Sequence, residues 1–122
     1  MGDLPREVFE KFASEYQTKI TETSRQLAMV RGQLQGRERE KRASELTAKE
    51  LSTLDDSVLA YRSVGRMFIQ EDVSLLKAEL DNKASSAAKE IVALERAAGK
   101  LDAELKDTEK SLQGLIKRAI GQ

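Results

Sequence analysis

The side chains that could do chemistry in this sequence are few, and the most suggestive are the adjacent carboxylates of Asp55 and Asp56. Two acidic groups can share acid–base work when burial or a nearby charge moves one pKa toward neutrality. Neighbouring residues on a turn point apart, however, and Ser57 extends a turn-forming, solvated stretch. We therefore interpret these carboxylates as part of a turn rather than a catalytic pair.

Other kinds of chemistry are excluded by residues that the chain lacks. It contains no His, Cys or Trp, which removes imidazole bases, thiol nucleophiles and Cys/His metal sites. It also contains no Gly-rich phosphate-binding loop of the Walker type. The sequence therefore predicts a protein that is not an enzyme and that uses no cofactor and no metal.

Composition narrows the class of partner. The 122 residues, enough for one domain, are 34% charged and 4% aromatic, which favours extended helices over a globular core. Lys and Arg total 21, as do Asp and Glu, so we predict no attraction to nucleic acid or to an anionic membrane. Neither a membrane-spanning run nor a signal peptide is evident, and we expect a cytoplasmic location.

Apolar residues recur with three-four spacing along two stretches, as in helices that pack along one narrow face. The first seam consists of Phe9, Phe12, Tyr16, Ile20, Thr23, Leu27, Val30 and Leu34. The second seam consists of Ala84, Ala87, Ile91, Leu94, Ala98, Leu101, Leu105, Thr108, Leu112, Leu115 and Ala119, preceded by Val73, Leu76 and Leu80. Each seam predicts one long helix.

The seams predict helices over about residues 5–46 and 73–120, folded back as an antiparallel intramolecular coiled coil within a single domain of residues 1–122. Asp72 is suited to the N-cap of the second helix. This packing places Phe9 near Leu115–Ala119 and Leu34 near Ala84–Ala87.

Charged residues follow the first seam. Arg37 and Lys41 fall on seam positions, so we expect the helix to continue with a weaker apolar interface. The run from Arg37 to Arg42 also contains Glu38 and Glu40. It is typical of a salt-bridged helix face, and contact with an acidic partner surface is the alternative.

The segment of residues 47–72 between the helices predicts a short helix and one β-hairpin. Thr47 and Glu50 have the spacing of a capping box, which predicts a short helix from about Ala48 to Thr53. Residues 58–64 and 67–70 have β-favouring composition around Gly65 and Arg66. Glycine at the first central position suits a type II′ turn.

The predicted hairpin is incomplete on its own. One face carries Val58, Ala60, Arg62, Val64, Met67 and Ile69, and the other carries Leu59, Tyr61, Ser63 and Phe68. Both faces are largely apolar, and a two-stranded hairpin is marginal in water. Its strand edges are also unpaired. Other chains are therefore expected to supply strands and cover, which favours assembly as the function.

Two coiled-coil arms joined by one hairpin, with Tyr-Arg-Ser-Val-Gly-Arg-Met-Phe-Ile at residues 61–69, resemble a β-class subunit of prefoldin over the whole chain. The resemblance implies a mainly α fold, in which a long antiparallel coiled-coil helical hairpin carries a short helix and a β-hairpin that joins an intersubunit β-barrel. It implies partners in a heterohexamer of two α-class and four β-class subunits. The implied function is ATP-independent capture of unfolded proteins such as actin and tubulin, and delivery to the cytosolic group II chaperonin.

The resemblance also implies roles for individual residues. The hairpin residues expected to serve assembly are Leu59, Tyr61, Val64, Gly65, Met67, Phe68 and Ile69. The arm-end residues expected to contact unfolded clients are Val8, Phe9, Phe12, Leu115, Ile116 and Ile120. For the end residues, plain packing of fraying coiled-coil ends is the alternative. For the chain as a whole, the alternative is a structural coiled-coil adaptor or tethering protein without client binding.

Overall fold

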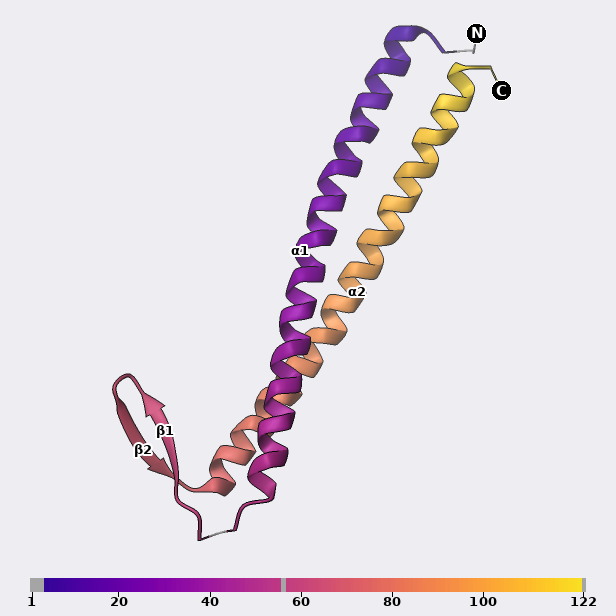
Figure 1. Cartoon of the computed structure of the whole chain (residues 1–122). Helices are drawn as coiled ribbons and strands as arrows, with labels where there is room; N and C mark the ends of the chain where they lie inside the picture. The colour runs from indigo at the N-terminus through magenta and orange to yellow at the C-terminus, as the bar shows by residue number, and fades with distance from the viewer. Residues whose placement is uncertain (1–3, 56, 122) are drawn as a thin grey trace. The chain divides into compact units, whose positions relative to one another are not determined.

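Two long helices with a single β-hairpin between them make up the fold of this chain (Figure 1). The computed structural model describes residues 4–55 and 57–121. The elements in chain order are α1 (Arg6–Ser52), β1 (Ala60–Val64), β2 (Met67–Glu71) and α2 (Val73–Ala119). The chain divides into a terminal unit, Met1–Gln33 with Leu94–Gln122, and a hairpin unit, Leu34–Ala93, and both helices run through both units.

The first helix is longer than the sequence predicts. It starts after Pro5, whose carbonyl accepts a hydrogen bond from the Phe9 amide at 3.0 Å, and it continues without interruption to Ser52. The prediction of a helix end near residue 46 and a separate short helix from Ala48 to Thr53 is therefore wrong. A capping box requires a non-helical N-cap residue, whereas Thr47 lies inside α1, in a stretch that contains no Gly or Pro.

A continuing packed face explains why α1 persists beyond Leu34. Arg37 and Lys41 are half-buried, Ser44 and Ala48 are buried, and the spacing remains three or four residues. Small side chains let helices approach closely, and long basic ones cover apolar surface with their methylene groups. The first seam thus extends through residues that an apolar pattern does not detect.

In the terminal unit, the two helices lie side by side with opposite chain directions (Figure 1). Thr23 and Leu27 of α1 are buried, as are Thr108 and Leu115 of α2. All four are seam positions, so the seams meet as predicted. Thr108 satisfies its hydroxyl by donating to the Glu104 carbonyl at 2.8 Å, which lets a polar residue occupy the packed face.

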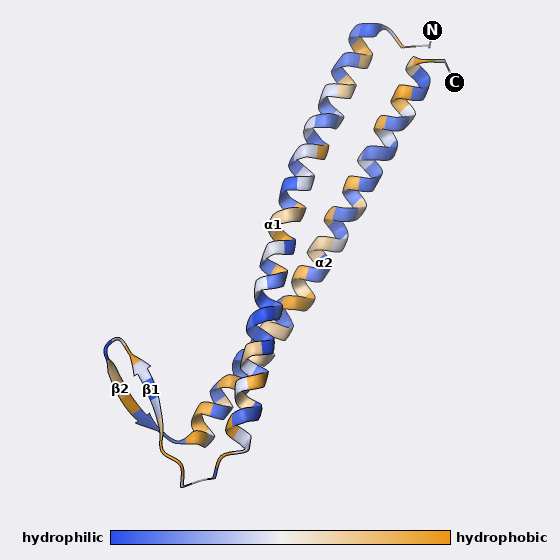
Figure 2. Cartoon of the chain, viewed as in Figure 1, coloured by the Kyte–Doolittle hydropathy of each residue, from blue (hydrophilic) through white to orange (hydrophobic). Residues whose placement is uncertain are grey.

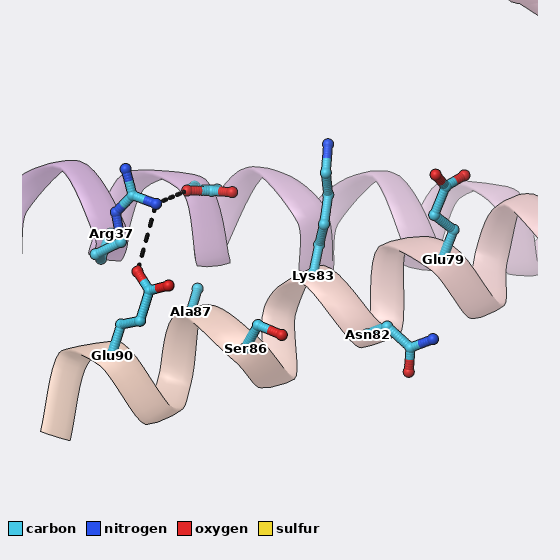
Figure 3. Close-up of a pocket in the computed structure, with 8 residues that line it drawn as sticks. Arg37, Glu79, Asn82, Lys83, Ser86, Ala87 and Glu90 are labelled. Carbon is cyan, nitrogen blue, oxygen red and sulfur yellow. Dashed lines mark ion pairs between the residues drawn. The ribbon is translucent and has the colours of Figure 1, made fainter. Parts of the chain in front are cut away.

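In the hairpin unit, an ion pair shows which residues of the two helices lie opposite one another. Arg37 Nη1 lies 3.4 Å from Glu90 Oε2 and 2.8 Å from Glu40 Oε2 (Figure 3). Because the helices run antiparallel, residues before Arg37 lie opposite residues after Glu90. Leu34 is therefore opposite the part of α2 that follows Glu90, and its predicted position beside Ala84–Ala87 is wrong. The seam positions after Leu34 are polar, so the predicted alignment of the two helices in this region depended on residue spacing alone.

The two strands form an antiparallel hairpin in the predicted register. Val64 pairs with Met67 next to the turn, and Ala60 pairs with Glu71 at the open end. Gly65 has a φ of +61°, and no non-glycine residue in the described ranges has a positive φ. A positive φ at the first central residue only defines a type II′ turn, as predicted. The strand β1 begins two residues later than expected.

A single residue separates the hairpin from the second helix. The carbonyl of Asp72 accepts hydrogen bonds from the amides of Leu75 and Leu76, both at 3.1 Å. Asp72 therefore occupies the predicted N-cap, and α2 spans Val73–Ala119. Among the described residues, neither helix has an apolar stretch of the length and hydropathy needed to cross a membrane.

Candidate functional site

The hairpin presents large apolar side chains to solvent along most of its length. Phe68 is 71% exposed, Met67 65%, Leu59 62% and Tyr61 56%. Figure 2 shows hydrophobic colouring over much of β2. Every residue predicted to serve assembly is exposed, namely Leu59, Tyr61, Val64, Gly65, Met67, Phe68 and Ile69.

These side chains belong to both faces of the hairpin. The register places Met67 and Ile69 on one face and Tyr61 and Phe68 on the other. The sheet has two strands in the described part of the chain, so each strand also has an edge of unpaired backbone groups. The structure therefore brings the predicted assembly residues together on a surface that offers apolar contact and strand pairing at once.

At its base, the hairpin is tied to α2 by Arg62. The Nε and Nη2 atoms of Arg62 each donate to an oxygen of Glu71, both at 2.9 Å. Its Nη1 donates to Glu79 Oε1 at 3.2 Å, and Nη2 also donates to Glu79 Oε2. One guanidinium thus joins β1, the last residue of β2 and the second turn of α2.

The Arg62–Glu71–Glu79 cluster shifts the pKa values of Arg62 and Glu79. Hydrogen bonds to Glu71, and then to Glu79, raise the pKa of Arg62 above its ordinary value. The hydrogen bond from Arg62 lowers the pKa of Glu79, with the nearby charge of Lys83 acting in the same direction and burial opposing both. Arg62 and Glu79 are thus both charged at neutral pH, and the ion pair between them persists across the physiological range.

Apolar residues outside the predicted set flank the base of the hairpin. Leu54 is 43% exposed, Val58 40% and Leu75 61%. A cavity of about 430 Å³ opens at the same place and is lined by Val58, Leu59, Gln70, Glu71, Asp72, Val73 and Ser74. Leu75 is outside the predicted set, although its place between the seam positions Val73 and Leu76 marks an apolar residue that faces away from the seam.

A second cavity, of about 260 Å³, lies along the two helices of the hairpin unit (Figure 3). Arg37, Glu40, Glu79, Asn82, Lys83, Ser86, Ala87 and Glu90 line it. Its main charges are already paired, because Arg37 bridges Glu40 and Glu90. No metal-binding group of three His, Cys, Asp or Glu residues occurs within residues 4–55 and 57–121. The cavity is therefore a polar stretch of the helix interface in which Arg37 is paired with neighbouring carboxylates.

The helix ends of the terminal unit expose apolar residues more sparingly. Ile120 is 55% exposed, Phe12 and Ile116 are 41% exposed, and Val8 is 36% exposed. Phe9 is half-buried, and Leu115 is buried at 7% exposure. Leu115 thus packs in the second seam, and the other five predicted residues are exposed or half-buried.

Comparisons with known proteins agree with this architecture. The family model described as prefoldin subunit matches residues 14–119. The chain is 31% identical to a probable prefoldin subunit 1 of Schizosaccharomyces pombe, over 71% of this chain and 78% of that one. It is 28% identical to prefoldin subunit 1 of Homo sapiens, over 87% of each chain.

A solved structure shows the same fold. The crystal structure of the prefoldin beta subunit from Thermococcus strain KS-1 superposes with a TM-score of 0.79 at 24% identity and covers 93% of this chain and 96% of that one. The chain therefore belongs to the prefoldin subunit family, whose members are non-enzymatic components of a co-chaperone. Its fold is that of the prefoldin beta subunit, and the curated relatives that it matches carry the name prefoldin subunit 1.

Proposed function

We propose that this chain is one of four β-class subunits that assemble with two α-class subunits into a hexameric, ATP-independent co-chaperone. The observation that carries the proposal is the hairpin, which exposes apolar side chains on both faces and unpaired backbone along both edges. An isolated surface of this kind is a template for pairing with other strands. Closure into an intersubunit β-barrel buries the inward face of the hairpin and removes both strand edges.

Strand addition explains why the partners are expected to be hairpins of similar subunits. Backbone hydrogen bonds along an edge supply affinity, and pockets for alternating side chains supply specificity. The strand edges would then pair with strands of neighbouring subunits. The interior or flank of the barrel would be filled by Leu59, Tyr61 and Phe68. The helices beside the hairpin leave its outer half open to such neighbours.

Co-expression with candidate α-class subunits, followed by native mass spectrometry, tests the assembly. The expected species is a heterohexamer of two α-class and four β-class chains, with this chain among the four. A stable homodimer with no hexamer would contradict the proposal and favour a coiled-coil adaptor or tethering protein. Expression of this chain alone is the matched control, and it should give no hexamer.

We further propose that the helix ends contact unfolded clients such as actin and tubulin through Val8, Phe9, Phe12, Ile116 and Ile120. Small, partly covered apolar patches suit weak and reversible binding, and several arms acting together raise avidity through effective concentration. The complex then delivers its client to the cytosolic group II chaperonin, which places the protein in the cytoplasm.

Aggregation of a denatured client tests this second proposal. The assembled complex should delay aggregation of denatured actin without ATP, and removal of residues 1–12 and 113–122 should weaken the delay while the hexamer persists. An unchanged time course for the truncated complex would exclude the helix ends as the client site. Transfer is measured separately, by following labelled actin from the complex to the chaperonin.

A further inference from the structure

The Arg62–Glu71–Glu79 cluster has a geometry that an ordinary surface ion pair lacks. Arg62 uses one edge of its guanidinium, Nε with Nη2, for Glu71 and the other edge, Nη1 with Nη2, for Glu79. A planar guanidinium group that donates hydrogen bonds along two of its edges restricts the orientation of both carboxylates. The arrangement therefore fixes orientation as well as supplying attraction.

The cluster spans the joint between the hairpin and α2. Glu71 ends β2, Asp72 alone follows, and Val73 begins α2. Two backbone dihedral angles at Asp72 thus set how the hairpin leaves the helix. Glu79 lies about 9 Å along the helix axis from Val73, at 1.5 Å per residue. A contact between β1 and Glu79 therefore limits rotation of the hairpin about the connection at Asp72.

Other connections across this joint are sparse. Among the residues that the structure describes, the side-chain hydrogen bonds between the strands and α2 are those from Arg62 to Glu79. The apolar residues of the hairpin do not substitute for them, because Val64, Met67 and Ile69, on the same face as Arg62, are exposed. The hairpin is therefore restrained at its base and open beyond it.

We propose that Arg62, acting through Glu71 and Glu79, sets the angle of the hairpin on α2 and so presents its faces and edges in the orientation that neighbouring subunits require. This inference rests on the proposed assembly function and names a positioning residue within it. A hairpin held at one angle loses less conformational freedom when partner strands add to its edges. Exposed ion pairs contribute little to folding stability, so positioning is the effect that the cluster can supply.

The hairpin angle is measured directly in the free chain. The native sequence has no Cys, so spin labels placed through Ser63→Cys on β1 and Ser85→Cys on α2 report one distance distribution within the hairpin unit. The labelled chain should give a narrow distribution. Glu79→Gln, which removes the charge on α2 but leaves Glu71 in place, should broaden it.

Two matched controls separate positioning from a general loss of charge. Glu90→Gln removes another paired carboxylate from α2, one that contacts Arg37 instead of the hairpin. Arg66→Gln removes an arginine from the turn of the same hairpin, outside the cluster. Both controls should keep the narrow distribution, and all variants should retain the helical circular dichroism and thermal midpoint of the parent chain.

Assembly provides the second readout. Glu79→Gln and Arg62→Gln should each raise the α-class partner concentration needed for half-assembly by about fivefold or more, while the controls stay within about twofold. The double variant Arg62→Gln with Glu79→Gln should be no worse than Arg62→Gln alone, since both remove the same link.

The outcomes distinguish this inference from the function on which it rests. If the parent chain does not assemble with α-class subunits, the proposed function fails, while the distance measurement still decides whether Arg62 positions the hairpin. If the parent assembles and Glu79→Gln leaves both the distance distribution and the half-assembly concentration unchanged, the positioning role is overturned.

Discussion

The hairpin and the helix ends both expose apolar side chains, but they expose different kinds of surface. On the hairpin, whole faces are open and the strand edges offer unpaired backbone groups. At the helix ends, backbone groups without a helical partner are confined to the terminal turns, and Leu115 is buried while its neighbour Ile116 is exposed. The first surface suits lasting assembly through directional hydrogen bonds, and the second suits brief contacts of low specificity.

The largest expected effect comes from placing a charge on the hairpin. Phe68→Asp puts a carboxylate where the barrel would bury an aromatic ring, and an unpaired buried charge is strongly unfavourable. The heterohexamer should disappear from native mass spectra, while the helical content of the free chain is retained. A normal yield of hexamer would show that the exposed faces are not the assembly surface.

The next effect concerns the packed side of the helix end. Leu115→Ala should lower the free energy of unfolding by about 2 kcal/mol, because it removes buried methyl groups and leaves a cavity. Chemical denaturation followed by circular dichroism measures this change. The same truncation at the exposed neighbour, Ile116→Ala, should cost less than about 0.5 kcal/mol; equal losses would contradict the division between buried and exposed end residues.

A substitution in the turn is expected to reduce hexamer assembly less than a charge placed on a face of the hairpin. Gly65→Val forces a β-branched residue into a positive φ, at a cost of about 1–2 kcal/mol, and should reduce hexamer yield in the co-expression assay. Gly65→Asn is the matched control, since Asn tolerates this conformation, and it should assemble nearly as well as the parent. Loss of hexamer from both variants would indicate that the turn has a role beyond its backbone conformation.

At the helix ends, a double change should alter binding without altering stability. Ile116→Ser with Ile120→Ser removes two exposed apolar groups and should leave the hexamer intact, with a thermal midpoint close to that of the parent. Its delay of actin aggregation should shorten by about threefold if these contacts act through avidity. An unchanged delay would assign both residues to plain end-packing.

The smallest effect is a dependence of the hairpin angle on pH. Arg62 and Lys83 hold the pKa of Glu79 below its ordinary value of 4.5, so its contribution is fully present above that value and is lost as the pH falls through the lower folded value. The distance distribution between labels at Ser63 and Ser85 should stay narrow near neutral pH and broaden as the pH falls below the ordinary pKa of a glutamate. A Glu79→Gln chain, which lacks this carboxylate, should show a smaller change.

The sequence predicted those parts of the fold that depend on local rules. Gly65 indicated the type II′ turn, Asp72 indicated the start of α2, and the apolar spacing indicated which faces of the helices meet. The extent of α1 was missed because Thr47 and Glu50 have the same spacing inside a helix as in a capping box. The buried Ser44 and Ala48 carry too little hydrophobicity to mark a packed face.

The candidate site was predictable in composition but not in arrangement. Exposure of Met67 and Phe68 follows from a two-stranded sheet with apolar residues on both faces. The link from Arg62 to Glu79 depends on the angle between a strand and a helix, which no local pattern encodes. The burial of Leu115 beside the exposed Ile116 likewise depends on which residue faces the other helix.

The unpaired strand edges also have a consequence for the newly synthesised chain before it assembles with other subunits. A newly made copy carries two open edges and a cluster of exposed apolar side chains until another hairpin adds to it, and such edges pair readily with one another and with unrelated strands. An orphan copy therefore has the features that lead cells to sequester or degrade a protein. We expect such a copy to accumulate only when partner chains cover these surfaces.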